Sequence, residues 1–204
     1  MIDIDSVMNA APVIPVLVVD DVAHARPLAE ALVAGGLPVL EVTLRTPHAL
    51  EVIAEMAKVR GAIVGAGTVI TAGDLAAALA AGAQFIVSPG ITAALGSAAR
   101  TSGVPFLPGV ASASDIIRAQ EMGFTRLKFF PAVAAGGLPM LRALAAPFAG
   151  VRFCPTGGIS PENAPAWLAE PAVACVGGSW IAKRGETDWA AIETRARAAA
   201  ALRR

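Results

Sequence analysis

The sequence predicts an α/β protein that folds as a closed (β/α)8 (TIM) barrel. Eight short segments rich in β-branched and aromatic residues recur at a fairly even spacing, and Ala- and Leu-rich segments with helical periodicity lie between them. The 204 residues are close to the lower end of the range of about 200 to 400 residues usual for this architecture, so the connections must be short. An open doubly wound sheet also alternates strand and helix and is the main structural alternative.

The predicted strands and helices follow one another along the whole chain. The strands comprise residues 13–19, 39–44, 62–66, 85–87, 105–107, 126–130, 151–154 and 173–176. Helical periodicity covers residues 23–33, 49–59, 72–81 and 192–202, and a short helix is expected at the N-terminus. Thr46-Pro47 and Ser160-Pro161 are typical of helix starts. Because no linker or low-complexity segment interrupts this pattern, we expect a single domain over residues 1–204.

Charge and cysteine content exclude several classes of protein. Sixteen basic residues balance sixteen acidic ones, so no broad positive field would attract nucleic acid or anionic lipid. Cys154 and Cys175 lie in apolar segments without zinc-site spacing, and His24 and His48 have no metal-ligand partners nearby in sequence, so we expect reduced thiols and no metal. No signal-peptide pattern and no apolar run of about 20 residues occurs. We therefore expect a cytoplasmic protein that binds no membrane.

A lysine interrupts the apolar sixth strand. Lys128 lies between Leu127 and Phe129, and burial there would disfavour its charged form and leave a nucleophilic amine able to form a Schiff base with a ketone. The alternative is that Lys128 extends to the rim of the barrel and pairs with a carboxylate. The only other lysines, Lys58 and Lys183, lie outside the strands, so any amine chemistry is assigned to Lys128.

The second strand carries polar residues on one face. Alternation places Glu41, Thr43 and Arg45 toward the barrel interior and the aliphatic residues toward the helices. Glu41 and Arg45 could form a purely structural ion pair. Their position at the carboxyl end of a strand favours function, because the active site of this architecture lies on that side of the barrel.

Two glycine pairs follow neighbouring strands near the end of the chain. Gly157-Gly158 follows the seventh strand and Gly177-Gly178 the eighth. Either pair alone is more typical of a tight turn. Together they predict a phosphate site, because paired glycines let backbone N–H groups approach an anion at the loops where these barrels bind phosphate. Thr68, at the end of the third strand, is either part of a simple turn or a further polar group at the same rim.

These motifs resemble one enzyme family, in register over nearly the whole chain. The motifs are Glu41-Val42-Thr43-Leu44-Arg45-Thr46, Gly65-Ala66-Gly67-Thr68, Ser88-Pro89-Gly90, Lys128-Phe129-Phe130-Pro131, Pro155-Thr156-Gly157-Gly158-Ile159-Ser160 and Gly177-Gly178-Ser179-Trp180. They look like those of the 2-keto-3-deoxy-6-phosphogluconate (KDPG) and 4-hydroxy-2-oxoglutarate (KHG) aldolases. One departure is Val133, where similar enzymes often carry an acidic residue.

The resemblance implies a homotrimeric class I aldolase of the Entner–Doudoroff pathway, without metal or other cofactor. Its substrate would be a phosphorylated 2-keto-3-deoxy sugar acid, and its products pyruvate and glyceraldehyde 3-phosphate. By the same resemblance, Lys128 forms the Schiff base and Glu41 shuttles protons. The remaining implied roles are binding of the pyruvyl carboxylate by Arg45 and Thr68 and of the phosphate by Thr156, Gly157, Gly158, Gly178 and Ser179.

Three other functions remain open from the residues themselves. A sibling aldolase could act on the galactonate epimer or on 4-hydroxy-2-oxoglutarate with the same imine chemistry. A phosphate-binding barrel isomerase or phosphate-ester synthase could use Lys128 only as a charge. A phosphosugar-binding protein without catalysis could keep the glycine pairs and have no use for a buried amine.

Overall fold

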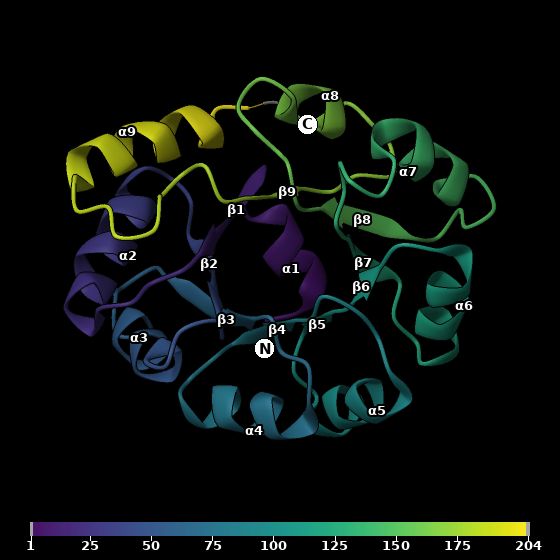
Figure 1. The fold of residues 1–204 in the computed structure, drawn as a ribbon, viewed down its shortest axis with the longest axis horizontal. Coiled ribbons are helices and arrows are strands. Elements are labelled where there is room, and N and C mark those ends of the chain that lie inside the picture. The colour runs from purple at the N-terminus through teal and green to yellow at the C-terminus, as the bar shows by residue number, and fades with distance from the viewer. Residues whose placement is uncertain (1, 203–204) are drawn as a thin grey trace.

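The computed structural model describes residues 2–202, which form a ring of parallel strands surrounded by helices (Figure 1). The elements in order are α1 (Ile4–Asn9), β1 (Val13–Leu17), η1 (Val22–His24), α2 (Ala25–Ala34), β2 (Val39–Thr43), α3 (Ala49–Met56), β3 (Ile63–Gly67), α4 (Ala72–Ala80), β4 (Phe85–Val87), α5 (Ala93–Ser102), β5 (Phe106–Leu107), β6 (Gly109–Val110), α6 (Ala113–Glu121), β7 (Arg126–Phe129), α7 (Gly137–Ala145), β8 (Arg152–Pro155), α8 (Ala164–Leu168), β9 (Val176–Gly178) and α9 (Trp189–Ala200). Within residues 2–202, no helix is long and apolar enough to span a bilayer.

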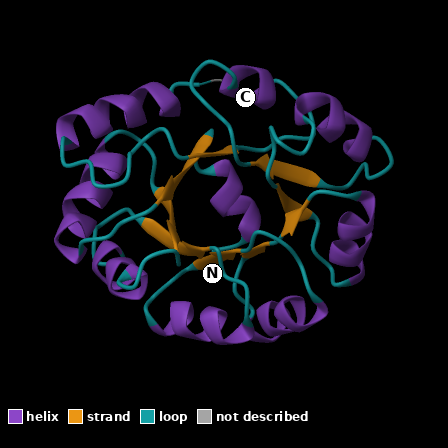
Figure 2. Ribbon diagram, in the orientation of Figure 1, coloured by secondary structure: helices purple, strands orange, loops and turns teal. Residues whose placement is uncertain are grey.

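The strands close into the predicted (β/α)8 barrel. One sheet runs in the order β5-β4-β3-β2-β1-β9 and a second in the order β6-β7-β8. Single bridges between Phe153 and Val173 and between Thr156 and Gly177 connect β8 to the β9 segment. β5 and β6 are the two halves of the fifth barrel strand, and they connect the two sheets on the other side. Figure 2 shows the resulting ring of strands inside its layer of helices, so the open doubly wound alternative is wrong.

The fifth and eighth strands differ from their predicted bounds. The fifth continues beyond residue 107 and is interrupted at Pro108, which has no N–H for the ladder, although its carbonyl accepts from the Lys128 N–H at 2.9 Å. The eighth lies at Val176–Gly178 instead of residues 173–176. It is displaced because residues 176–178 are the ones that pair with β1, where Pro15 faces Gly178.

The two predicted helix starts are also wrong. α3 begins at Ala49, and the Thr46 hydroxyl donates to the Val19 carbonyl at 2.8 Å instead of capping the helix. α8 begins at Ala164, four residues after Ser160. The Ser160 N–H donates to the Asn163 side chain at 2.9 Å. In both cases such a hydrogen bond holds the connecting turn, so the helix begins later than the proline predicts.

The expected N-terminal helix closes one end of the barrel. In Figure 1, α1 lies within the ring of strands. Val7 and Met8 are fully buried there against inward residues from the first half of several strands, among them Ile14 and Val39. Asp5 forms an ion pair with Arg126, the first residue of β7. These contacts place α1 at the amino end of the strands and leave the carboxyl end for the site.

Candidate active site

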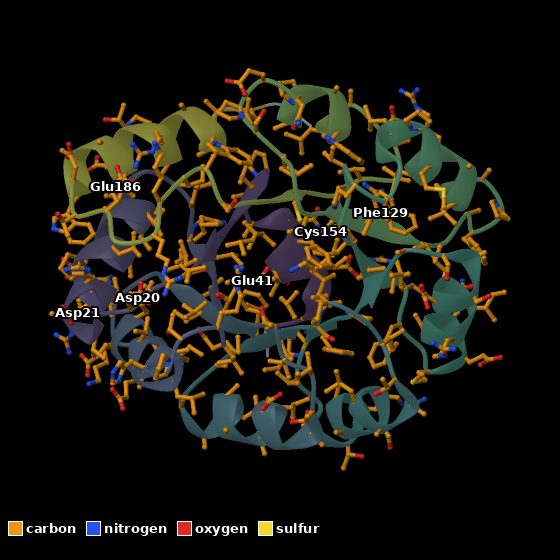
Figure 3. The ribbon with its side chains drawn as sticks, in the orientation of Figure 1. Asp20, Asp21, Glu41, Phe129, Cys154 and Glu186 are labelled. Atoms are coloured by element: carbon orange, nitrogen blue, oxygen red, sulfur yellow. The ribbon has the colours of Figure 1, made fainter. Side chains whose placement is uncertain are left out.

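Glu41 and Lys128 meet inside the barrel. Each is the third residue of its strand, β2 or β7, and its strand neighbours belong to the apolar layer between strands and helices, so alternation directs both side chains inward. Lys128 Nζ donates to Glu41 Oε1 at 3.0 Å, and the two residues are 5% and 3% exposed. Figure 3 shows Glu41 within the ring. An amine and a carboxylate therefore lie in hydrogen-bonding contact, shielded from bulk water.

This pairing differs from both structural alternatives. Lys128 does pair with a carboxylate, but it is buried and does not extend to the solvent at the rim. Glu41 pairs with Lys128 and not with Arg45. Removing one member of such a pair leaves an uncompensated buried charge, so the two residues depend on each other.

Arg45 and Thr68 lie beyond the ends of neighbouring strands, on the carboxyl side. Arg45 is exposed in the turn after β2, and its guanidinium forms no hydrogen bond or ion pair with any residue in the 2–202 range. Thr68 follows β3 directly and has φ 61°. A β-branched residue rarely adopts this left-handed conformation, which costs on the order of 1–3 kcal/mol and is found most often at functional sites. The described contacts bring neither residue against the Glu41–Lys128 pair.

The predicted phosphate loops lie at neighbouring strand ends. Gly157 and Gly158 both have positive φ, 99° and 78°, which glycine adopts without strain. Gly177 allows Thr156 to approach, because a Cβ there would lie 2.2 Å from the Thr156 hydroxyl oxygen. Gly178 belongs to β9 itself, so only Ser179, which is exposed, follows the strand. The second glycine pair is therefore strand and not loop, contrary to the prediction.

The loop after β7 packs on the Gly157-Gly158 turn. A Cβ at Gly157 would lie 3.4 Å from the Phe130 ring, and one at Gly158 would lie 2.7 Å from Val133. The Val133 N–H donates to the Gly157 carbonyl at 3.1 Å. The segment that carries Lys128 and the expected phosphate loop thus support each other.

Two further residues around Lys128 were not predicted. The Lys128 ammonium nitrogen lies 5.3 Å from the centre of the Phe130 ring. Cys154 is the register partner of Lys128 on β8 and is 2% exposed. Alternation along the seventh strand would have placed Cys154 inward, but its partner depends on the register between two strands, which the sequence alone does not give.

Ion pairs join the loops on the carboxyl side of the first and last strands. Arg184, after β9, donates two hydrogen bonds to Asp20, after β1, at 2.7 and 2.6 Å. These bonds lower the pKa of the Asp20 carboxyl. Glu186 lies 2.6 Å from Arg195, and that hydrogen-bonding partner lowers the pKa of Glu186 as well. Both carboxylates lie near α9 and α2 at the periphery in Figure 3, away from Glu41 within the ring, so they fix loops and not the Glu41–Lys128 pair.

Residues 4–195 match the KDPG and KHG aldolase family, which is most of the chain. The chain belongs to this family. A 2-dehydro-3-deoxy-phosphogluconate aldolase of Zymomonas mobilis is 56% identical over 204 residues, which cover 100% of this chain and 98% of the relative. The family membership makes the protein an aldolase, a lyase, and excludes the isomerase and non-catalytic alternatives.

Two solved structures of KDPG aldolases are close to this one. The Zymomonas mobilis enzyme with 3-phosphoglycerate has a TM-score of 0.97 at 56% identity and covers 99% of this chain and 97% of its own. The Legionella pneumophila enzyme, with pyruvate captured as a covalent carbinolamine, has a TM-score of 0.95 at 46% identity and covers 98% and 99%. This chain therefore shares the barrel of these two KDPG aldolases over nearly its whole length.

Proposed function

We propose that the chain is a class I aldolase that cleaves KDPG into pyruvate and glyceraldehyde 3-phosphate in the Entner–Doudoroff pathway. The observation that carries the proposal is the buried contact of 3.0 Å between the Lys128 amine and the Glu41 carboxylate. A buried amine beside a proton acceptor is what imine formation with a ketone requires. The covalent pyruvate adduct captured in the Legionella pneumophila relative supports the same chemistry.

Lys128 starts the reaction. Its ammonium transfers a proton to Glu41, and the free amine attacks the C2 ketone of the substrate. The proton held by Glu41 then passes to the carbinolamine hydroxyl, which leaves as water, so that a protonated imine and the Glu41 carboxylate remain. This cation is the electron sink for the bond cleavage that follows.

Glu41 carries the protons of the later steps. The carboxylate accepts the proton of the C4 hydroxyl, directly or through water, as the bond between C3 and C4 breaks and the aldehyde leaves. The two electrons of that bond neutralise the imine and give the enamine of pyruvate. The protonated Glu41 then returns a proton to C3, and water hydrolyses the imine to release pyruvate and the Lys128 amine.

The remaining site residues hold the two ends of the substrate. Arg45 and Thr68 would bind the pyruvyl carboxylate, for which a guanidinium offers a fixed pair of donors. The phosphate would lie on the backbone and hydroxyl groups of Thr156, Gly157, Gly158, Gly178 and Ser179. Binding the remote phosphate can help to place the reacting bond next to Lys128.

Trapping with pyruvate and borohydride tests the proposal. The folded protein is incubated with both reagents and digested, and any reduced adduct is located by mass spectrometry. We expect a pyruvyl mass on Lys128 that is absent from Lys128→Ala and retained in Lys58→Ala and Lys183→Ala, which change the other two lysines. Folded protein without an adduct on any lysine would contradict the proposal.

KHG is a second candidate substrate, because the family includes KHG aldolases. KHG has no phosphate, so cleavage rates on purified KDPG, its galactonate epimer and KHG separate the three aldolase activities.

We also propose that the enzyme works as a homotrimer in the cytoplasm. Light scattering coupled to size-exclusion chromatography tests the trimer, for which a mass near three times 20.6 kDa is expected.

A further inference from the structure

The Glu41 carboxylate lies where a side chain at position 67 would be. A Cβ built on Gly67 would lie 2.2 Å from Glu41 Oε1, the oxygen that accepts from Lys128. It would also lie 2.7 Å from Cγ and 2.8 Å from Cδ of Glu41. Distances under about 3 Å are repulsive between such atoms, so the carboxylate could not keep this position if residue 67 carried a methyl group.

The register explains why Glu41 reaches this point. Glu41 is the direct partner of Gly65 on β3, whereas Gly67 is the partner of Thr43, two residues nearer the carboxyl end. Side chains in strands lean along the strand direction, and the long Glu41 side chain extends toward the carboxyl end until its carboxylate lies beside Gly67. The Glu41 carboxylate therefore fills space that a side chain at position 67 would otherwise occupy.

We propose that Gly67 is a positioning residue of the aldol reaction, because its lack of a side chain holds open the place from which Glu41 faces Lys128. The inference rests on the proposed aldolase function. The Thr43 hydroxyl on the next strand is bound to the Leu17 carbonyl at 2.8 Å, so the β2 backbone is anchored beside this place. A methyl group at position 67 must therefore displace the Glu41 carboxylate more than the backbone of β2.

The first test separates imine formation from proton transfer. Exchange of the pyruvate methyl protons in D2O, followed by NMR, needs both the Lys128 imine and the proton shuttle, whereas borohydride trapping needs only the imine. For Gly67→Ala we expect the adduct on Lys128 still to accumulate on long incubation, because irreversible reduction collects even slowly formed imine, and the exchange rate to fall about 100-fold, as for a misplaced catalytic group. Glu41→Gln should show the same pattern.

Gly65→Ala is the matched control. Gly65 is on the same strand and also faces inward, but a Cβ there would meet the Phe85 ring at 2.5 Å and not a carboxylate. We expect a lower melting temperature, with an exchange rate per folded molecule close to that of the wild type. Wild-type exchange by Gly67→Ala, or equal loss in the two glycine variants, would overturn the inference. Absence of trapping in the wild type would instead overturn the aldolase proposal.

A second test covers a Gly67→Ala variant that does not fold. In a Glu41→Ala/Lys128→Ala background no carboxylate lies next to position 67 and no buried charge is left without its partner, so adding Gly67→Ala should lower the melting temperature much less than it does in the wild type. Recovery of folding in this triple variant supports the inference. An equal cost in both backgrounds, or a triple variant that fails to fold although its Glu41→Ala/Lys128→Ala parent folds, would show that the added methyl group meets something other than Glu41.

Discussion

At the scale of single residues, catalysis depends on one buried pair of opposite charge. Lys128 and Glu41 share a buried hydrogen bond, with the Phe130 ring near the Lys128 amine and Gly67 against the Glu41 carboxylate. Neither charged side chain has an ion-pair partner other than the other among residues 2–202. Changing either residue therefore removes the hydrogen-bonding partner of the other.

Glu41→Gln should separate binding from proton transfer. The amide has nearly the same shape but cannot carry the proton of the C4 hydroxyl, so we expect kcat on KDPG to fall by roughly 10²- to 10⁴-fold while KM changes little. Steady-state kinetics with coupled detection of pyruvate measures both constants. A variant that keeps the wild-type kcat would remove Glu41 from the mechanism.

Arg45→Lys should impair the enzyme although the charge is kept. A lysine cannot reproduce the two parallel hydrogen bonds of a guanidinium to a carboxylate, so we expect kcat/KM to fall about tenfold or more. Arg60→Lys is the control, because Arg60 is exposed in the turn after α3, away from the strand ends that carry the site. Equal kinetics for the two variants would argue against carboxylate binding by Arg45.

At the scale of elements, the loop between β7 and α7 joins the amine to the expected phosphate site. Val133 is 46% exposed and packs on Gly158. A carboxylate here would lie beside the proposed phosphate position. Two unit charges about 4 Å apart repel by about 1 kcal/mol even in water, which is about fivefold in affinity.

Val133→Asp should therefore discriminate between substrates. We expect KM for KDPG to rise about fivefold or more and KM for KHG, which has no phosphate, to stay nearly unchanged. Val133→Thr, of similar size and uncharged, should leave both constants near the wild-type values. A parallel rise for both substrates would place the effect in the loop structure and not in phosphate binding.

α1 should contribute measurably to stability through its buried face. Met8→Ala removes a fully buried side chain from the closed end of the barrel, and we expect the free energy of unfolding to fall by about 2–5 kcal/mol. Ser6→Ala changes an exposed residue of the same helix, whose hydroxyl bonds the exposed N-cap Asp3, and should cost no more than about 1 kcal/mol. Urea unfolding followed by circular dichroism measures both, and similar values for the two variants would show that α1 is not a stabilising part of the barrel.

The sequence predicted elements better than it predicted contacts between them. Lys128 could be found as the lysine inside an apolar strand and Glu41 by alternation, and the barrel itself is confirmed. Their mutual contact could not be found, because it joins residues 87 positions apart and depends on how the ring closes. Pro108 could have signalled the interrupted fifth strand, since proline removes a ladder donor. Gly67 could not have been linked to Glu41 without the register of β2 and β3.

At the scale of the whole molecule, ion pairs on the surface make the stability of the fold depend on pH. Hydrogen bonds from arginine lower the pKa of Asp20 and Glu170, and bonds from Lys58 and Arg26 lower that of Glu55. A carboxyl with a lower pKa in the folded state than in the unfolded state stabilises the fold above its unfolded value, and this contribution disappears as the pH falls through the folded pKa.

The melting temperature should thus fall with acidification below the unfolded values of 4.5 for Glu and 3.8 for Asp, and stay nearly level from there to neutrality as far as these groups determine it. Calorimetry between pH 7 and pH 3 measures the profile. Asp20→Asn, which removes one of these carboxyls, should show a smaller acid-induced decrease than the wild type. A steeper decrease would reverse the assigned sign.

The position of α1 also sets an order of events on the ribosome. α1 precedes the barrel strands along the chain, yet the apolar cluster that buries Val7 and Met8 includes Cys154 and Cys175, more than 140 residues later. At about 5 to 20 residues per second, roughly 10 to 30 s pass between their synthesis. The apolar face of α1 therefore becomes fully buried only after most of the chain has been synthesised.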